Sequence, residues 1–172
     1  KQICVIDSRA AAGAMVLLIR RAQALMEAAG DDGDFDALCQ QLHRYQATLR
    51  TCFTLENFDN LIKNGRMRPI VGTLLRSLGI HIIADATAEG TIHVADKARG
   101  VGKTYRAITA LMKASKDCTD AEVVISHCEN LEGAMALKRQ ILADLPVKQV
   151  DLLSCRGLTS FYAMEKGLIV GY

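Results

Sequence analysis

Residues 80–112, IHIIADATAEGTIHVADKARGVGKTYRAITALM, carry the strongest secondary-structure signals of the chain. Two β-type runs, 80–84 and 91–98, are separated by a Glu-Gly turn, which predicts a β-hairpin. Apolar residues at helical spacing follow directly: Tyr105, Ile108 and Met112. A hairpin followed at once by a helix predicts a mixed α/β fold, in which helices pack on a β-sheet.

Helix and strand signals alternate through the rest of the chain as well. A helix is predicted over residues 13–29, because five apolar residues recur on one face: Met15, Leu18, Ile19, Ala22 and Met26. Asp34 is a suitable N-cap for a second helix, and Asn130 for a later one. Shorter elements complete the pattern: helices up to residue 63 and over 69–78, and strands at 3–6, 48–54, 122–126, 147–153 and 168–170.

Composition excludes several classes of protein. The 172 residues are 50% apolar, which is ample for a folded core and argues against disorder. Twenty-one Lys and Arg face 19 Asp and Glu, and a balance this even argues against a nucleic-acid-binding protein. The longest apolar stretch, Ala10 to Ile19, is shorter than the ~20 residues that a membrane span needs.

Cysteine and histidine spacing indicates neither a metal site nor a redox motif. The six cysteines contain no C-x-x-C pair, and the four histidines lack the spacing of metal ligands. Most of the cysteines stand in apolar stretches, and no signal peptide is visible. We therefore expect reduced, buried thiols in a cytoplasmic protein without a metal or other cofactor.

Two short segments could hold an anion. Gly100-Val101-Gly102-Lys103-Thr104 ends like a phosphate-binding loop, although Lys97 stands where the first glycine of that motif belongs. A nucleotide- or phosphate-using enzyme built on this turn is therefore one alternative. The other segment, Asn64-Gly65-Arg66-Met67-Arg68, places two guanidinium groups beside a glycine turn, and guanidinium suits carboxylates and phosphates.

Taken in order, several pieces of the chain resemble the DegV family of bacterial fatty-acid-binding proteins. Each piece is common alone, but their order and spacing over nearly the whole chain make the resemblance specific. The pieces are Val5-Ile6-Asp7-Ser8-Arg9, Thr54-Leu55, Asn64-Gly65-Arg66, Leu74-Leu75, Gly79-Ile80, Lys97-Ala98-Arg99-Gly100, Arg156-Gly157-Leu158-Thr159-Ser160-Phe161-Tyr162-Ala163 and Gly167-Leu168-Ile169-Val170-Gly171-Tyr172.

The resemblance implies a two-lobe fold with a long-chain fatty acid between the lobes. Residues 1–30 would be the last strand and helix of the N-terminal lobe, and residues 31–172 the C-terminal lobe, so the chain is expected to be a fragment of a longer protein. Family members do no chemistry themselves and present the fatty acid carboxylate to a partner kinase. This chain would thus be a non-catalytic lipid carrier.

The resemblance also assigns roles to individual residues. Arg66 corresponds to an arginine of the polar network around the carboxylate, and Arg99 to a surface arginine that meets the kinase. Tyr162 stands where many members have a histidine, so it would donate a hydrogen bond to the head group without being charged at neutral pH. Part of the tunnel would be lined by apolar side chains of this lobe: Ile70, Leu74, Leu75 and Ile82.

Two departures from the family pattern support a further alternative. Besides Tyr162 in place of the histidine, Ala10, Ala11 and Ala12 follow Asp-Ser-Arg where serine is frequent. A chain with these changes could have kept the fold and lost the ligand. An interaction module is therefore the other reading to be tested beside the carrier and the enzyme.

Overall fold

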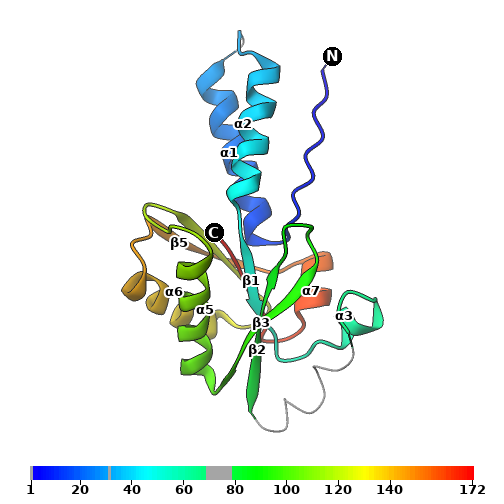
Figure 1. Cartoon of the computed structure of the whole chain (residues 1–172), viewed down its shortest axis with the longest axis vertical. Helices are drawn as coiled ribbons and strands as arrows, with labels where there is room; N and C mark the ends of the chain where they lie inside the picture. Colours follow the sequence, from blue (N-terminus) through cyan, green and yellow to red (C-terminus); the bar gives the residue numbers. More distant parts are fainter. Residues whose placement is uncertain (1, 31, 69–78) are drawn as a thin grey trace.

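A single mixed sheet organises the computed structural model, which describes residues 2–30, 32–68 and 79–172 (Figure 1). Its six strands lie in the order β3-β2-β1-β6-β4-β5. The described strands are β1 Thr51–Thr54, β2 Ile80–Ala86, β3 Ile92–Arg99, β4 Glu122–His127, β5 Gln149–Ser154 and β6 Leu168–Gly171. The described helices are α1 Gly13–Ala29, α2 Phe35–Thr48, α3 Asp59–Lys63, α5 Val101–Ser115, α6 Leu131–Asp144 and α7 Gly157–Ala163. The predicted mixed α/β class is confirmed.

Strand pairing follows the order of signals in the sequence. β2 and β3 form the predicted antiparallel hairpin, with an irregularity between Ile83 and Ala84, and α5 follows β3 as expected. β1 pairs antiparallel with both β2 and β6, and β6 also pairs antiparallel with β4. β4 and β5 are parallel, and α6 connects them. A parallel pair needs such a crossover, because a tight turn reverses the chain direction and can join only antiparallel strands.

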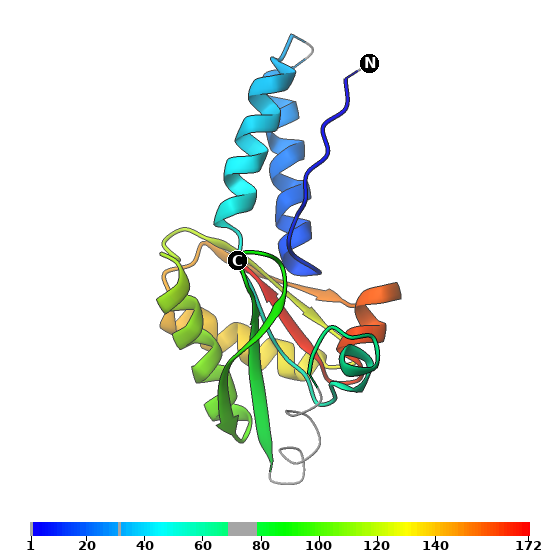
Figure 2. The same cartoon turned by 45° about the vertical axis from the view of Figure 1, so that its right-hand side comes forward.

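The main core lies between the sheet and two helices that cover one of its faces. α5 and α6 lie side by side on this face (Figures 1 and 2). Strand residues that point to them alternate with residues that point away, as the pleat requires. The fully buried members of this core include Ile83, Ile108, Met112, Val123, Ile125, Leu137, Ile141 and Val170.

The helical hairpin of α1 and α2 projects from the sheet, and the N-terminal segment runs beside it (Figure 1). The apolar face predicted for α1 is wrong, because Ile19 and Met26 are each 63% exposed. Ala14, Leu17 and Leu25 are buried instead. The contacts of α1 explain which of its residues are buried. Small residues at its start pack on β4 and β6, while the rest of the helix faces α2.

The strand predicted at residues 3–6 is also wrong in this structure. Residues 2–11 form neither helix nor strand, and Ile3 and Val5 are 78% and 84% exposed. Within the described ranges no strand pairs with this segment, and a single strand leaves its backbone groups without a ladder. The apolar pattern of residues 3–6 therefore has no sheet here against which to be buried.

The two helix N-caps predicted from the sequence, Asp34 and Asn130, are confirmed. The Asp34 carboxylate accepts hydrogen bonds from the backbone nitrogens of Asp36 and Ala37, at 3.0 and 3.1 Å. Asn130 Oδ1 accepts one from the Gly133 nitrogen at 3.1 Å.

α7 was not predicted, and the helix expected over 69–78 lies outside the described residues.

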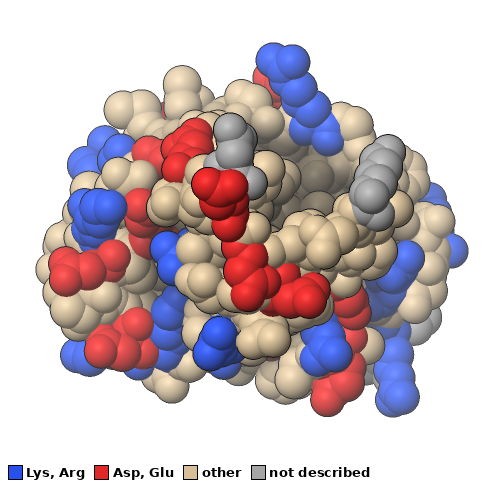
Figure 3. Space-filling view, turned by 90° about the horizontal axis from the view of Figure 1, so that it is seen from above, with Lys and Arg blue, Asp and Glu red and all other residues tan. Residues whose placement is uncertain are grey.

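The surface carries both signs of charge. Seen from above the α1–α2 hairpin, Lys and Arg alternate with Asp and Glu and with uncharged residues (Figure 3). Arg20 of α1 reaches back to Asp151 of β5, with 2.6 Å between Nη1 and Oδ2. Among the helices that the structure describes, none has both the length and the hydropathy needed to cross a membrane.

Candidate functional site

A second cluster of buried apolar residues lies on the side of the sheet opposite α5 and α6. Strands β1, β2 and β6 contribute to it, and so do the short helices α3 and α7 (Figure 2). We call it the α3–α7 face. Its buried members are Phe53, Leu55, Phe58, Leu61, Ile82, Ala84, Ala163 and Ile169.

A hydrogen bond links α3 to α7 over this face. Asn60 Nδ2 donates a hydrogen bond of 2.6 Å to the backbone oxygen of Phe161. The rings of Phe161 and Tyr162 stand edge to face, with 5.1 Å between their centres and 74° between their planes. Tyr162 and the partly buried Ile62 both pack against the α3–α7 face. The two helices thus form one rim of the apolar surface.

The structure places three of the predicted binding residues in or beside this face. Ile82 is one of its buried members, and Tyr162 is half-buried against it. Arg66 is exposed in the turn after α3, where its backbone nitrogen donates to the Leu61 oxygen at 2.8 Å. The next residue, Met67, packs on the face and so anchors the turn at its edge.

Other predicted residues lie elsewhere or outside the described ranges. Arg99 is exposed at the end of β3, next to the first turn of α5, and does not belong to the α3–α7 face. Ile70, Leu74 and Leu75 fall among residues 69–78, which are outside the described part of the chain. Their predicted place in a tunnel lining stays a prediction.

Two cysteines at the face were not singled out from the sequence. Cys128 and Cys155 directly follow β4 and β5, whose last paired residues are His127 and Ser154, and both pack against the α3–α7 face. Burial raises the pKa of the Cys155 thiol to about 11, and burial also raises the pKa of Cys128. Both groups are therefore neutral at physiological pH and act as small apolar side chains. All six cysteines lie in the described ranges, and all are free thiols.

The Gly100–Thr104 turn lacks the setting of a nucleotide-binding loop. In such a loop the glycine-rich turn follows a buried parallel strand and wraps a phosphate. Here it follows β3, which lies at the end of the sheet and pairs antiparallel with β2. The Thr104 hydroxyl, which would face a metal ion in that motif, donates to the Gly100 oxygen at 3.0 Å.

Comparison with known proteins shows which family has this arrangement. The model of the DegV family, described as a family of uncharacterised proteins, matches residues 1–168. The chain belongs to the DegV family. It is 32% identical over 171 residues to a DegV domain-containing protein of Streptococcus gordonii, and 33% identical over 173 residues to one of Streptococcus pneumoniae. Each alignment covers 99% of this chain and 59% of the relative, so the chain spans about 59% of their length.

Solved DegV structures share the fold at high similarity. A DegV protein of Ruminococcus gnavus with vaccenic acid matches with a TM-score of 0.90 and 30% identity, over all of this chain and 60% of that one. The Fatty Acid Kinase (Fak) B3 protein of Streptococcus pneumoniae, loaded with linoleic acid, matches with a TM-score of 0.89 and 32% identity. That alignment covers 99% of this chain and 59% of the other. The DegV resemblance seen in the sequence is confirmed.

Proposed function

We propose that this DegV chain is part of a non-catalytic carrier that binds one long-chain fatty acid on its α3–α7 face. The observation that carries the proposal is a second apolar cluster on the sheet, with the exposed Arg66 in a turn that Met67 anchors at its edge. Each acyl CH₂ that leaves water contributes about 0.8 kcal/mol, so such a surface suits a long alkyl chain. The fatty acids held by the Ruminococcus gnavus and pneumococcal relatives support this ligand class.

We further propose that residues 1–30 belong to the N-terminal lobe and residues 31–172 to the C-terminal lobe. Ile3, Val5, Ile19 and Met26 support this division, because all four are large apolar side chains exposed on one end of the molecule. Surfaces of this kind usually mark contacts with another protein surface. The curated relatives are longer than this chain, and their additional residues would supply that surface. The fatty acid would then lie between the two lobes.

In this proposal, Arg66 binds the fatty acid carboxylate and Tyr162 donates a hydrogen bond to it. We expect Arg66→Ala to weaken the binding of oleic acid about tenfold, since a hydrogen bond to a charged group contributes ~1.5–3 kcal/mol. Isothermal titration of the protein at its natural length, freed of lipid, measures the dissociation constant. Oleyl alcohol should bind the variant and the unchanged protein alike, because it has no carboxylate.

Arg68→Ala is the matched control for this experiment. Arg68 is also exposed and lies two residues further along the same segment, but the resemblance assigns it no role. It should therefore leave both dissociation constants within about twofold. Equal losses of oleic acid affinity in Arg66→Ala and Arg68→Ala would show that the whole basic segment acts through its charge. Unchanged oleic acid binding in Arg66→Ala would remove Arg66 from the head-group site.

We also propose that the partner is a fatty acid kinase and that Arg99 meets it. The name of the pneumococcal relative supports a kinase partner, and Arg99 is exposed at the end of β3, where it can reach another protein. We expect Arg99→Glu to lower phosphoryl transfer to bound oleic acid at least tenfold, because it reverses the charge offered to an acidic surface. Coupled turnover of ATP by the kinase measures this, and oleic acid affinity should not change. Lys97→Glu is the control, because Lys97 is also exposed on β3. Equal rates of phosphoryl transfer for Arg99→Glu and the unchanged protein would contradict the role of Arg99.

A further inference from the structure

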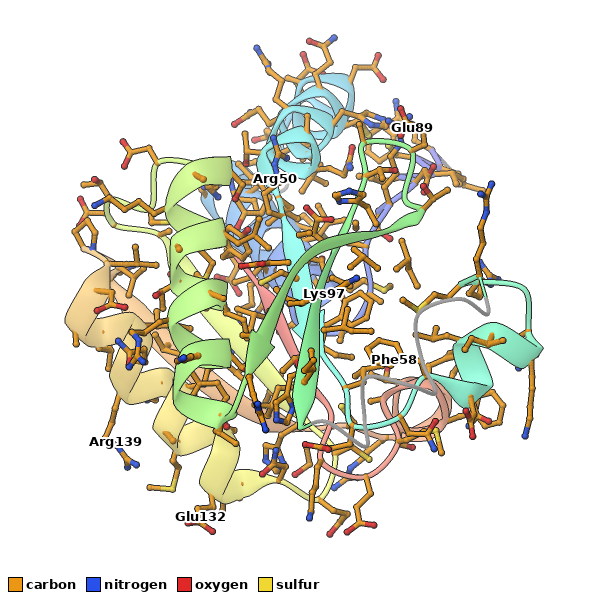
Figure 4. The ribbon with its side chains drawn as sticks, turned by 60° about the horizontal axis from the view of Figure 1, so that its bottom comes forward. Arg50, Phe58, Glu89, Lys97, Glu132 and Arg139 are labelled. Atoms are coloured by element: carbon orange, nitrogen blue, oxygen red, sulfur yellow. The ribbon has the colours of Figure 1, made fainter. Side chains whose placement is uncertain are left out.

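The N-terminal segment, residues 2–11, runs beside the helical hairpin in the same direction as α2 (Figure 1). Two hydrogen bonds fix its C-terminal end. Gln46 Nε2 of α2 donates to the Ser8 backbone oxygen at 3.3 Å. Arg9 Nη1 donates to a backbone oxygen in the turn between β2 and β3 at 3.0 Å. Figure 4 labels Glu89 in this turn, next to the blue N-terminal segment. The segment therefore has a defined register against α2.

Cys4 of this segment stands level with Cys39 of α2. Cys4 precedes Ser8 by four residues, and four residues of extended chain span about 13 Å. Cys39 precedes Gln46 by seven residues, which is two helical turns and about 10 Å. The segment and α2 run in the same direction from the contact of Ser8 with Gln46, so the two cysteines lie at similar distances from that contact.

The Cys4 side chain points toward the hairpin. Along the segment Cys4, Ile6 and Ser8 are half-buried, whereas Ile3 and Val5 are exposed. In an extended chain alternate side chains point to opposite sides, so Cys4 lies on the covered side. Its thiol is thus turned to the helices rather than to solvent.

The thiols of Cys4 and Cys39 are in contact. The pKa of Cys39 is raised to about 11, most by a hydrogen bond to the Cys4 thiol and less by burial and by the charges of Cys4 and Asp36. Cys39 therefore keeps its proton at physiological pH. Both cysteines are free thiols and only half-buried, so a small oxidant can reach them. In the part of the chain that the structure describes no strand pairs with the segment, so its backbone can make the shift that an S–S bond requires.

We propose that Cys4 and Cys39 are a redox-sensitive pair, which a peroxide converts into a disulfide that fastens the N-terminal segment to α2. The Cys4 thiolate attacks the peroxide and breaks its O–O bond, which leaves a sulfenic acid on Cys4 and releases hydroxide. The Cys39 sulfur then displaces the sulfenic hydroxyl group, which leaves as water with the Cys39 proton. Two thiols and one hydrogen peroxide thus give one disulfide and two water molecules.

The disulfide would join two parts of the chain that we assign to different lobes. Cys4 belongs to residues 1–30 and Cys39 to residues 31–172, so oxidation would tie the lobes together at this end of the molecule. Only this consequence rests on the lobe division proposed above, because formation of the disulfide requires neither the second lobe nor a fatty acid. Ile3 and Val5 lie on the other side of the segment, so a surface that covers them leaves the thiol pair in place.

Hydrogen peroxide added to the protein at its natural length tests the proposal. Trypsin then places Cys4 in peptide 2–9 and Cys39 in peptide 22–44, because neither peptide has a Lys or Arg except at its end. Mass spectrometry without reductant should find the two peptides joined, with a mass lower than their sum by two hydrogen atoms. Dithiothreitol should separate them again. The intact protein should show the same loss of mass and remain a single chain.

Single substitutions show whether this pair is specific. Cys4→Ser and Cys39→Ser should each abolish the joined peptide. Cys128→Ala is the matched control, because Cys128 is half-buried like Cys4 and packs with Cys155 on the α3–α7 face. This variant should form the joined peptide in normal yield.

Thermal unfolding gives a second readout. The midpoint of the oxidised protein should lie about 5 °C or more above that of the reduced protein, since the cross-link lowers the entropy of the unfolded chain. An equal or lower midpoint would mean that the cross-link distorts the fold, which would overturn the proposal. So would the absence of the joined peptide from the oxidised protein, or its formation only between two protein molecules.

Discussion

Gly171→Ala is expected to lower the free energy of unfolding by about 3 kcal/mol, the upper range for overpacking in a well-packed core. Gly171 ends β6 directly beneath the start of α1. A Cβ there would overlap the backbone of Gly13 and Ala14, and backbone atoms cannot turn aside as a flexible side chain can. The variant must therefore push α1 away from β4 and β6, which also disturbs the contacts of Leu17.

Urea unfolding followed by circular dichroism measures this loss. Gly102→Ala is the control, because a Cβ at Gly102 meets only the Arg106 guanidinium, at 3.9 Å, and alanine favours a helix. That variant should be as stable as the unchanged protein or gain up to ~1 kcal/mol. Neutral surface substitutions change the free energy of unfolding by up to about 0.5 kcal/mol. If the free energy of unfolding of Gly171→Ala lies within this range of the unchanged protein, α1 does not pack on β6 as described.

Two adjacent isoleucines of β2 should respond differently to fatty acid. Ile82 and Ile83 are both almost fully buried, but Ile82 belongs to the α3–α7 face and Ile83 to the core under α5 and α6. Replacing either by alanine should cost about 3 kcal/mol of stability, because each leaves a cavity. Only Ile82→Ala should also weaken oleic acid binding, by about tenfold, since only its side chain belongs to the α3–α7 face on which the ligand is proposed to bind.

Thermal unfolding with and without oleic acid separates the two variants. A bound ligand raises stability according to its affinity, so the rise in midpoint temperature should be smaller for Ile82→Ala than for Ile83→Ala. Equal rises would mean that the fatty acid does not contact the α3–α7 face at Ile82. A smaller rise in midpoint temperature for Ile83→Ala than for Ile82→Ala would place the ligand on the other side of the sheet.

Elements with one clear pattern were predictable from the sequence. The hairpin of β2 and β3 consists of two β-type runs joined at a glycine turn, and α5 has a single apolar side, so both were found within a few residues. The caps Asp34 and Asn130 were also found, because each side chain can satisfy a free helix amide by itself. Local chemistry was sufficient in all these cases.

Other features depend on contacts between distant segments. α1 carries apolar residues around much of its circumference, so periodicity alone could not show that Leu17, rather than Ile19, faces the sheet. The position of Cys128 beside Cys155 results from the register of β4 and β5. α7 has too few residues to display a helical period. Arg66 stood out by its place in a glycine turn with two guanidinium groups, but its pairing with Tyr162 followed from family resemblance alone, because the two lie nearly 100 residues apart in the chain.

The most direct test of the carrier proposal is organic extraction and mass spectrometry of the purified protein at its natural length. The account predicts about one long-chain fatty acid per protein molecule. The same measurement on residues 1–172 alone shows whether the α3–α7 face holds lipid without further chain. A folded natural-length protein that carries no fatty acid, even after incubation with oleic acid, would contradict the account.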